Sequence, residues 1–146
     1  MSLPIPKPGL VIRYSFLWSN EKAKGTEEGT KDRPCAIVVA TKRAADVDID
    51  TIVAPITHQP PEDSAASIEI PAATCKSLGL DGGRHWLRLD ELNRFAWPGF
   101  DLRPIPGSRD RYEYGMLPPR LFQQLREGIL TRQKERAGRI ISRNEE

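Results

Sequence analysis

The order of apolar and polar positions predicts β-strands in the first half of the chain. In residues 10–18 alternate side chains are large and apolar, and they share one face because successive strand residues point to opposite sides. They are Ile12, Tyr14, Phe16 and Trp18. A run of small and β-branched residues over 34–40 predicts a buried strand, and Pro34 suits its first position, where no backbone donor is needed.

Four further runs predict strands, separated by segments rich in glycine, proline and polar residues. The runs cover residues 51–56, 67–70, 86–92 and 112–116. A short helix is expected over 72–78, and Gly79 would end it. The strongest helix signal begins at Pro118 and Pro119 and extends to about residue 136, with apolar residues at every fourth position.

Short strands in series, long polar loops and one helix near the C-terminus predict a mainly β fold. We expect a small, curled antiparallel barrel. One domain should cover residues 1–136, and the polar residues 137–146 are expected to form a disordered tail. The predicted loop 19–32 is longer than a tight hairpin needs, and long loops in compact domains are often functional.

Composition narrows the class of protein. The chain has 146 residues, of which 38% are hydrophobic and 29% charged, which favours a soluble globular protein over a disordered one. No apolar run has the length of a membrane span, and the N-terminal residues lack the features of a secretory signal, so we expect a cytoplasmic protein without a membrane partner. The net charge of +2 permits contact with nucleic acid but does not argue for it.

The sequence contains no motif for a metal or a cofactor. Cys35 and Cys75 lack the spacing of a metal site, and two histidines, His58 and His85, offer little to a site built from histidine. Glycine-rich phosphate loops and nucleophile-elbow patterns are also missing. We therefore expect neither a metal ion nor a cofactor.

Arg33 is the most suggestive charged residue. Pro34 biases it toward an extended backbone, so Arg33 should lie at the lip of a rigid strand with a flexible loop behind it. Such a position suits a cation that binds a ligand. It also suits an arginine that only caps the end of a strand and faces solvent. These residues alone favour that simpler interpretation.

The order of these segments resembles the MazF/PemK family of toxins from bacterial toxin–antitoxin systems. The resemblance runs from about residue 7 to about residue 132 and rests mainly on two motifs. One is Arg33-Pro34 before an apolar strand, and the other is Ala54-Pro55-Ile56-Thr57 at the end of the next strand. The family implies an SH3-like barrel of the MazF/PemK/CcdB type with a C-terminal helix, usually as a homodimer.

The resemblance also implies an activity, which is sequence-specific, metal-independent endoribonuclease cleavage of single-stranded mRNA at short motifs, and a cognate antitoxin as partner. Arg33 and Thr57 match the family's catalytic pair. The chemistry is compatible with that role. When the 2′-hydroxyl of RNA attacks the adjacent phosphorus, a planar guanidinium suits the phosphate oxygens and a threonine hydroxyl can donate to another of them. The group that deprotonates the 2′-hydroxyl stays open.

Four further residues are candidate RNA contacts: Lys31, His58, Arg94 and Trp97. His58 directly follows Thr57 and could shuttle a proton, although a loop histidine without a role is the simpler interpretation. Arg94 stands one position after Asn93, where the family often has arginine, and a shift by one residue turns a strand side chain to the opposite face. Trp97 either stacks on an RNA base or covers the end of the barrel.

Fold alone does not fix function, so a second hypothesis stays open. The family's fold is shared with toxins that poison gyrase by protein contact. The alternative is therefore a non-catalytic module that binds nucleic acid or protein, either gyrase-poison-like or an inactive relic.

Overall fold

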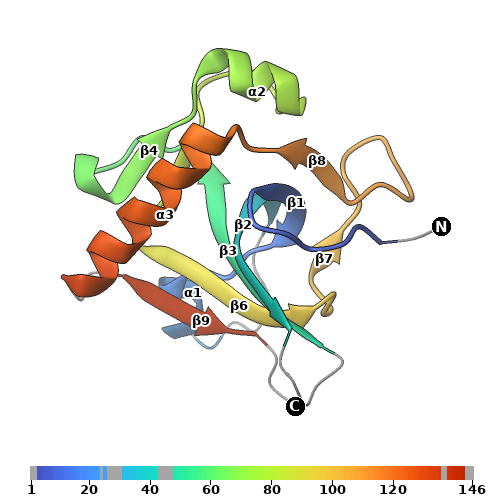
Figure 1. Cartoon of the computed structure of the whole chain (residues 1–146), viewed down its shortest axis with the longest axis horizontal. Helices are drawn as coiled ribbons and strands as arrows, with labels where there is room; N and C mark the ends of the chain where they lie inside the picture. Colours follow the sequence, from blue (N-terminus) through green and yellow to red (C-terminus); the bar gives the residue numbers. More distant parts are fainter. Residues whose placement is uncertain (1–2, 24, 26–30, 43–47, 136–137, 144–146) are drawn as a thin grey trace.

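The computed structural model describes residues 3–23, 25, 31–42, 48–135 and 138–143. Within them lie nine β-strands, three α-helices and one 3₁₀ turn (Figure 1). The strands are β1 (Leu10–Ser15), β2 (Asp32–Lys42), β3 (Ile49–Thr57), β4 (Ser67–Glu69), β5 (Trp86–Arg88), β6 (Glu91–Trp97), β7 (Leu102–Arg103), β8 (Glu113–Met116) and β9 (Arg139–Ser142). The helices are α1 (Ser19–Ala23), α2 (Ala72–Leu78) and α3 (Pro119–Lys134), and the 3₁₀ turn is η1 (Ser64–Ala66).

The strands form one largely antiparallel sheet around β2 and β3. The main path through it runs β4-β5-β3-β2-β1-β7, β6 pairs with β3, and β8 pairs with β1. The mainly β class predicted from the sequence is therefore confirmed. The pairings among the described strands do not close into a barrel.

The sheet separates two apolar clusters, and α3 lies across one of its faces (Figure 1). Alternate residues of β2 enter different clusters: Ala36 and Val38 face the cluster under α3, and Cys35 and Ile37 face the other. The central strand is therefore buried on both faces, as the apolar run predicted. None of the described helices has the length and apolar character of a membrane span.

Both periodic patterns seen in the sequence face these clusters. The apolar stripe of α3 is buried in the first cluster through Leu121, Leu125 and Ile129. The alternating side chains of β1 and the residue after it enter the second cluster, where Trp18 packs against the buried set. The predicted end of α2 is also confirmed, because Gly79 adopts a left-handed conformation with φ of 70°.

The strand predicted over 86–92 is wrong in its extent, because it consists of two strands. β5 pairs with the end of β3 at Ile56 and Thr57, whereas β6 pairs with its earlier part over Ile49–Val53. The chain bends at 89–90 between them, and β6 continues to Trp97. Apolar alternation runs on through this bend, so the pattern alone does not reveal it.

The disordered tail predicted for residues 137–146 is contradicted over Arg139–Ser142, which form β9 beside β6 in parallel. Residues 137 and 144–146 of that tail, and residues 24 and 26–30 of the predicted loop 19–32, lie outside the described residues. The described part of that loop contains α1.

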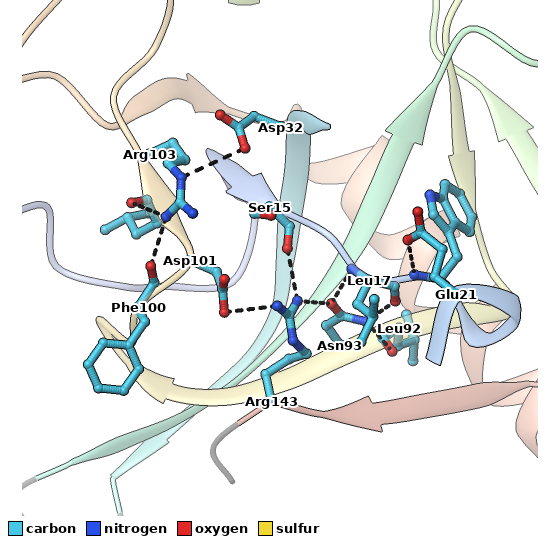
Figure 2. A network of polar contacts seen from close by, with 12 residues as sticks. Ser15, Leu17, Glu21, Asp32, Leu92, Asn93, Phe100, Asp101, Arg103 and Arg143 are labelled. Atoms are coloured by element: carbon cyan, nitrogen blue, oxygen red, sulfur yellow. Dashed lines mark hydrogen bonds and ion pairs between the residues drawn. The ribbon is translucent and has the colours of Figure 1, made fainter. Parts of the chain in front are cut away.

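Arg143 fastens the end of β9 to the body of the protein. Its Nη1 donates to the Ser15 carbonyl at 2.8 Å and to Asn93 Oδ1 at 2.9 Å, and its Nη2 lies 3.0 Å from Asp101 Oδ2 (Figure 2). The side chains of Arg143 and Asp101 are only 4% and 11% exposed. A buried, well-connected ion pair therefore orders the chain where a polar tail was expected.

Candidate active site

The neighbouring ends of β2 and β3 bring Arg33 and Thr57 together. The two strands pair antiparallel with Cys35 opposite Pro55. Continued by two residues on each strand, the same register sets Arg33 opposite Thr57. Opposed residues of such a ladder share one face, with Cβ atoms typically about 5 Å apart. Both residues line the same two pockets, so the predicted pair meets in one place.

Two prolines lie near this pair, and Pro55 stands where the sheet changes its pairing. β3 pairs with β6 as far as Val53 and with β5 from Ile56 onward. Pro55 has no backbone N–H to offer and lies between these two pairings. Pro34 lies opposite Arg13 of β1, directly after Arg33. The catalytic candidates therefore extend from stiff strand ends.

The two pockets adjoin, since both are lined by Arg33, Thr57 and Gln59. The larger has a volume of about 460 Å³ and also contains the cations of Arg13 and Lys31. The smaller has a volume of about 400 Å³. Together they form an open polar depression with the predicted catalytic pair at its centre.

The Arg33 guanidinium is held but not neutralised. Its central carbon lies 5.1 Å from the centre of the Trp18 ring, and its Nε is buried without a hydrogen-bond partner among the described residues. The adjacent carboxylate of Asp32 lies 3.8 Å from Arg103 instead. Burial lowers the pKa of Arg33 from its ordinary value, opposed by Cys35 and Glu21, yet an arginine stays charged. The guanidinium has no ion-pair partner among the described residues, so its charge favours an anion in the pocket that it lines.

Thr57 has a hydroxyl proton to donate. Its Oγ1 accepts a hydrogen bond from the Gln59 backbone N–H at 3.1 Å, and its residue is only 8% exposed. A hydroxyl that accepts one bond can still donate its hydrogen. The backbone contact therefore fixes the oxygen while leaving the donor available at the pocket.

The carboxylates that line the smaller pocket already accept hydrogen bonds from α1 and the residue before it. Glu91 accepts from the Ser19 backbone N–H at 2.9 Å and from its hydroxyl at 2.6 Å. Glu21 accepts from the Trp18 backbone N–H at 3.0 Å. These bonds spread the two negative charges over local donors, which weakens their attraction for Arg33.

The candidate RNA contacts separate into two groups. Lys31 and His58 line the larger pocket. Arg94 makes a two-bond ion pair with Asp50 at 2.9 and 2.8 Å, and Trp97 lies in β6 near Phe95, with ring centres 6.1 Å apart. Neither Arg94 nor Trp97 lines the two pockets described here, and their contact with RNA stays a prediction.

Both ring nitrogens of His58 face oxygen atoms of the protein. Nδ1 lies 2.9 Å from the Arg84 carbonyl and Nε2 lies 3.0 Å from Asp81 Oδ1. A general base needs a nitrogen within reach of the proton that it takes. This arrangement therefore gives the proton-shuttle hypothesis no support. A hydrogen bond from His85, opposed by partial burial, lowers the pKa of Asp81.

Sequence reasoning missed several residues that shape the site. Trp18 was assigned only to a strand face, yet its ring lies under Arg33 and 5.3 Å from the Arg88 guanidinium. Gln59 was not singled out, although it stands two positions after Thr57 and lines both pockets. Its spacing was the one available signal, because residues two apart in extended chain share a side.

Comparisons with known proteins do not name a family. No family model matches the chain, and no curated protein matches it either. What the protein does must therefore be argued from the site itself.

Proposed function

We propose that this protein is the toxin of a bacterial toxin–antitoxin system, a metal-independent endoribonuclease that cuts single-stranded mRNA in the cytoplasm. Its fold would then be the SH3-like barrel of the MazF/PemK/CcdB type with α3 as the C-terminal helix. The observation that carries the proposal is the meeting of the Arg33 cation and the Thr57 hydroxyl in one pocket. The motif resemblance supplies the reaction.

In the proposed reaction the 2′-hydroxyl gives up its proton as its oxygen bonds to the adjacent phosphorus. The bond to the 5′-oxygen of the next nucleotide breaks, and this oxygen takes up a proton and leaves as a 5′-hydroxyl. Negative charge gathers on the phosphate oxygens as this happens. The Arg33 guanidinium would donate to two of them, and the Thr57 hydroxyl would donate to one. Trp18 keeps the guanidinium in place, so little reorganisation is needed when the charge develops.

Replacing Thr57 with valine tests the contribution of the threonine hydroxyl to the cleavage rate, which is the smaller of the two proposed contributions. Valine keeps the shape and removes the hydroxyl, so cleavage should slow by roughly 10²-fold, the typical loss for one oxyanion donor. Single-turnover cleavage of a labelled single-stranded RNA measures this. Ser108→Ala, which removes a hydroxyl from an exposed loop, is the control and should cleave at the wild-type rate. Equal rates for all three proteins would remove Thr57 from the reaction.

One observation keeps the non-catalytic alternative open. Four carboxylates line the two pockets, and they would oppose a polyanion: Glu21, Asp32, Asp81 and Glu91. Expression in bacteria without an antitoxin separates the hypotheses. Growth arrest with cleaved mRNA supports the ribonuclease, whereas arrest with intact mRNA and damaged DNA supports a gyrase poison. No effect on growth points to an inactive relic.

We also expect a homodimer, with the RNA groove shared between subunits. Sheets with free edges invite symmetric pairing. Light scattering at micromolar concentration should give twice the 16.4 kDa mass of the chain. A mass of one chain would contradict the shared groove. The expected antitoxin would bring an acidic segment that matches the cations of Arg13, Lys31 and Arg33.

A further inference from the structure

Three side chains beside the catalytic pair aim their polar atoms at one point. Asp81 Oδ1 lies 3.0 Å from His58 Nε2 and 3.1 Å from His85 Nε2. These three atoms all lie within 4.8 Å of one another, and the two imidazole ring centres are 4.1 Å apart. His58 follows the end of β3, while Asp81 and His85 belong to the turn between α2 and β5. Residues far apart in the chain thus converge here.

The hydrogen positions on His58 follow from its partners. A backbone carbonyl can only accept, so Nδ1 of His58, 2.9 Å from the Arg84 carbonyl, must carry a hydrogen. In the neutral ring Nε2 then presents a lone pair to Asp81 Oδ1, which is also an acceptor. Two acceptors at 3.0 Å require a cation between them, either a proton or a metal ion.

His85 directs its ring toward the same oxygen from a buried position. It is 2% exposed, and its Nδ1 is buried without a hydrogen-bond partner among the described residues. Its other ring nitrogen, Nε2, lies 3.1 Å from Asp81 Oδ1. The burial fixes the ring, so His85 presents Nε2 to this point at little further entropic cost.

We propose that His58, Asp81 and His85 form a binding site for one divalent transition-metal ion of the zinc type. Imidazole nitrogen and carboxylate oxygen are ligands that zinc prefers. A ligand histidine usually donates its second N–H to a carbonyl or carboxylate, as His58 does to Arg84. Ligand atoms about 2.0–2.2 Å from one ion lie roughly 3–3.5 Å apart, so small side-chain rotations would complete the site.

The site opens into the pocket of the proposed reaction. Its three residues line the larger pocket together with Arg33 and Thr57, and the Asp81 side chain is 81% exposed. Three protein ligands leave a tetrahedral ion one position for water or another oxygen ligand. An ion held there would lie in the same pocket as the place proposed for the RNA phosphate. The ion is not part of the proposed cleavage, so binding and cleavage can be tested separately.

Calorimetric titration of chelator-treated, full-length protein with zinc chloride tests the proposal without RNA. The wild type should bind one Zn²⁺ per chain. Loss of a group that only hydrogen-bonds to a metal ligand weakens metal binding by roughly 10–100-fold. Asp81 is itself a proposed ligand, so Asp81→Asn should weaken zinc binding by at least about 100-fold. Asp81 is exposed, so this variant should keep its fold, which circular dichroism checks. His85→Ala should weaken binding as strongly.

Asp110→Asn is the matched control, because Asp110 is an exposed carboxylate that is not one of the three proposed ligands and does not line the larger pocket, and it should bind zinc like the wild type. Cobalt provides a second readout, since its visible absorption should appear with the wild type and not with Asp81→Asn. Absence of saturable zinc binding by the wild type, or equal binding by folded Asp81→Asn, would overturn the proposal. Cleavage of RNA in chelator would be unaffected by either result.

Discussion

Replacing Arg33 with alanine is expected to abolish RNA cleavage, with a loss of at least about 10³-fold in the single-turnover rate. The Arg33 guanidinium lines both pockets, and no described carboxylate forms an ion pair with it. The replacement would leave the Thr57 hydroxyl in place but would take away the guanidinium that is proposed to donate to two of the phosphate oxygens. The rate of cleavage of a labelled single-stranded RNA, at saturating protein, measures the loss.

The same variant should keep its thermal midpoint nearly unchanged. Arg33 is half-buried and stacks on Trp18, but its Nε is buried without a hydrogen-bond partner in the part of the chain that the structure describes, so its removal also ends an unfavourable burial. Arg126→Ala, on the exposed side of α3, is the control and should cleave RNA normally. If Arg33→Ala instead lost stability heavily and still cut RNA, the arginine would be structural.

The second large effect concerns stability rather than activity. Replacing Arg143 with alanine should lower the free energy of unfolding by about 3–5 kcal/mol, because it leaves a buried carboxylate on Asp101 without this cation. The variant also loses the hydrogen bonds to Ser15 and Asn93, which tie β9 to β1 and β6 (Figure 2). Unfolding in urea at fixed protein concentration measures the change.

Arg139→Ala supplies the matched control for that measurement. Arg139 belongs to the same strand, but its side chain is exposed, so its replacement should change the free energy of unfolding by no more than about 0.5 kcal/mol. Equal stability of the two variants would show that Arg143 does not anchor the C-terminal strand.

Local patterns in the sequence predicted those parts of the fold that depend on local physics. The stripe of α3 and the alternation through β1 follow from helix and strand periods, and both are buried as expected. The meeting of Arg33 and Thr57 was predictable for a related reason. Arg33 directly precedes Pro34 near the start of β2, and Thr57 ends β3 two residues after Pro55. Neighbouring antiparallel strands bring such ends together.

The parts that sequence reasoning missed depend on contacts between distant segments. β9 pairs with β6 in parallel, and Arg143 reaches Ser15 and Asn93 across 128 and 50 residues of chain. No local pattern encodes such a partner. The convergence of His58 with Asp81, 23 residues away, is equally invisible in the sequence, where two histidines seemed too few for a site.

In the proposed reaction Arg33 and Thr57 act on one phosphodiester bond while the 2′-hydroxyl attacks it. The most direct measurement is the chemistry of the ends produced when purified protein cuts single-stranded RNA in excess chelator. We expect internal cleavage that leaves a 2′,3′-cyclic phosphate and a 5′-hydroxyl, and no cut where the neighbouring 2′-hydroxyl is replaced by hydrogen. RNA that stays intact at equimolar protein, or a cut at the deoxy position, would contradict it.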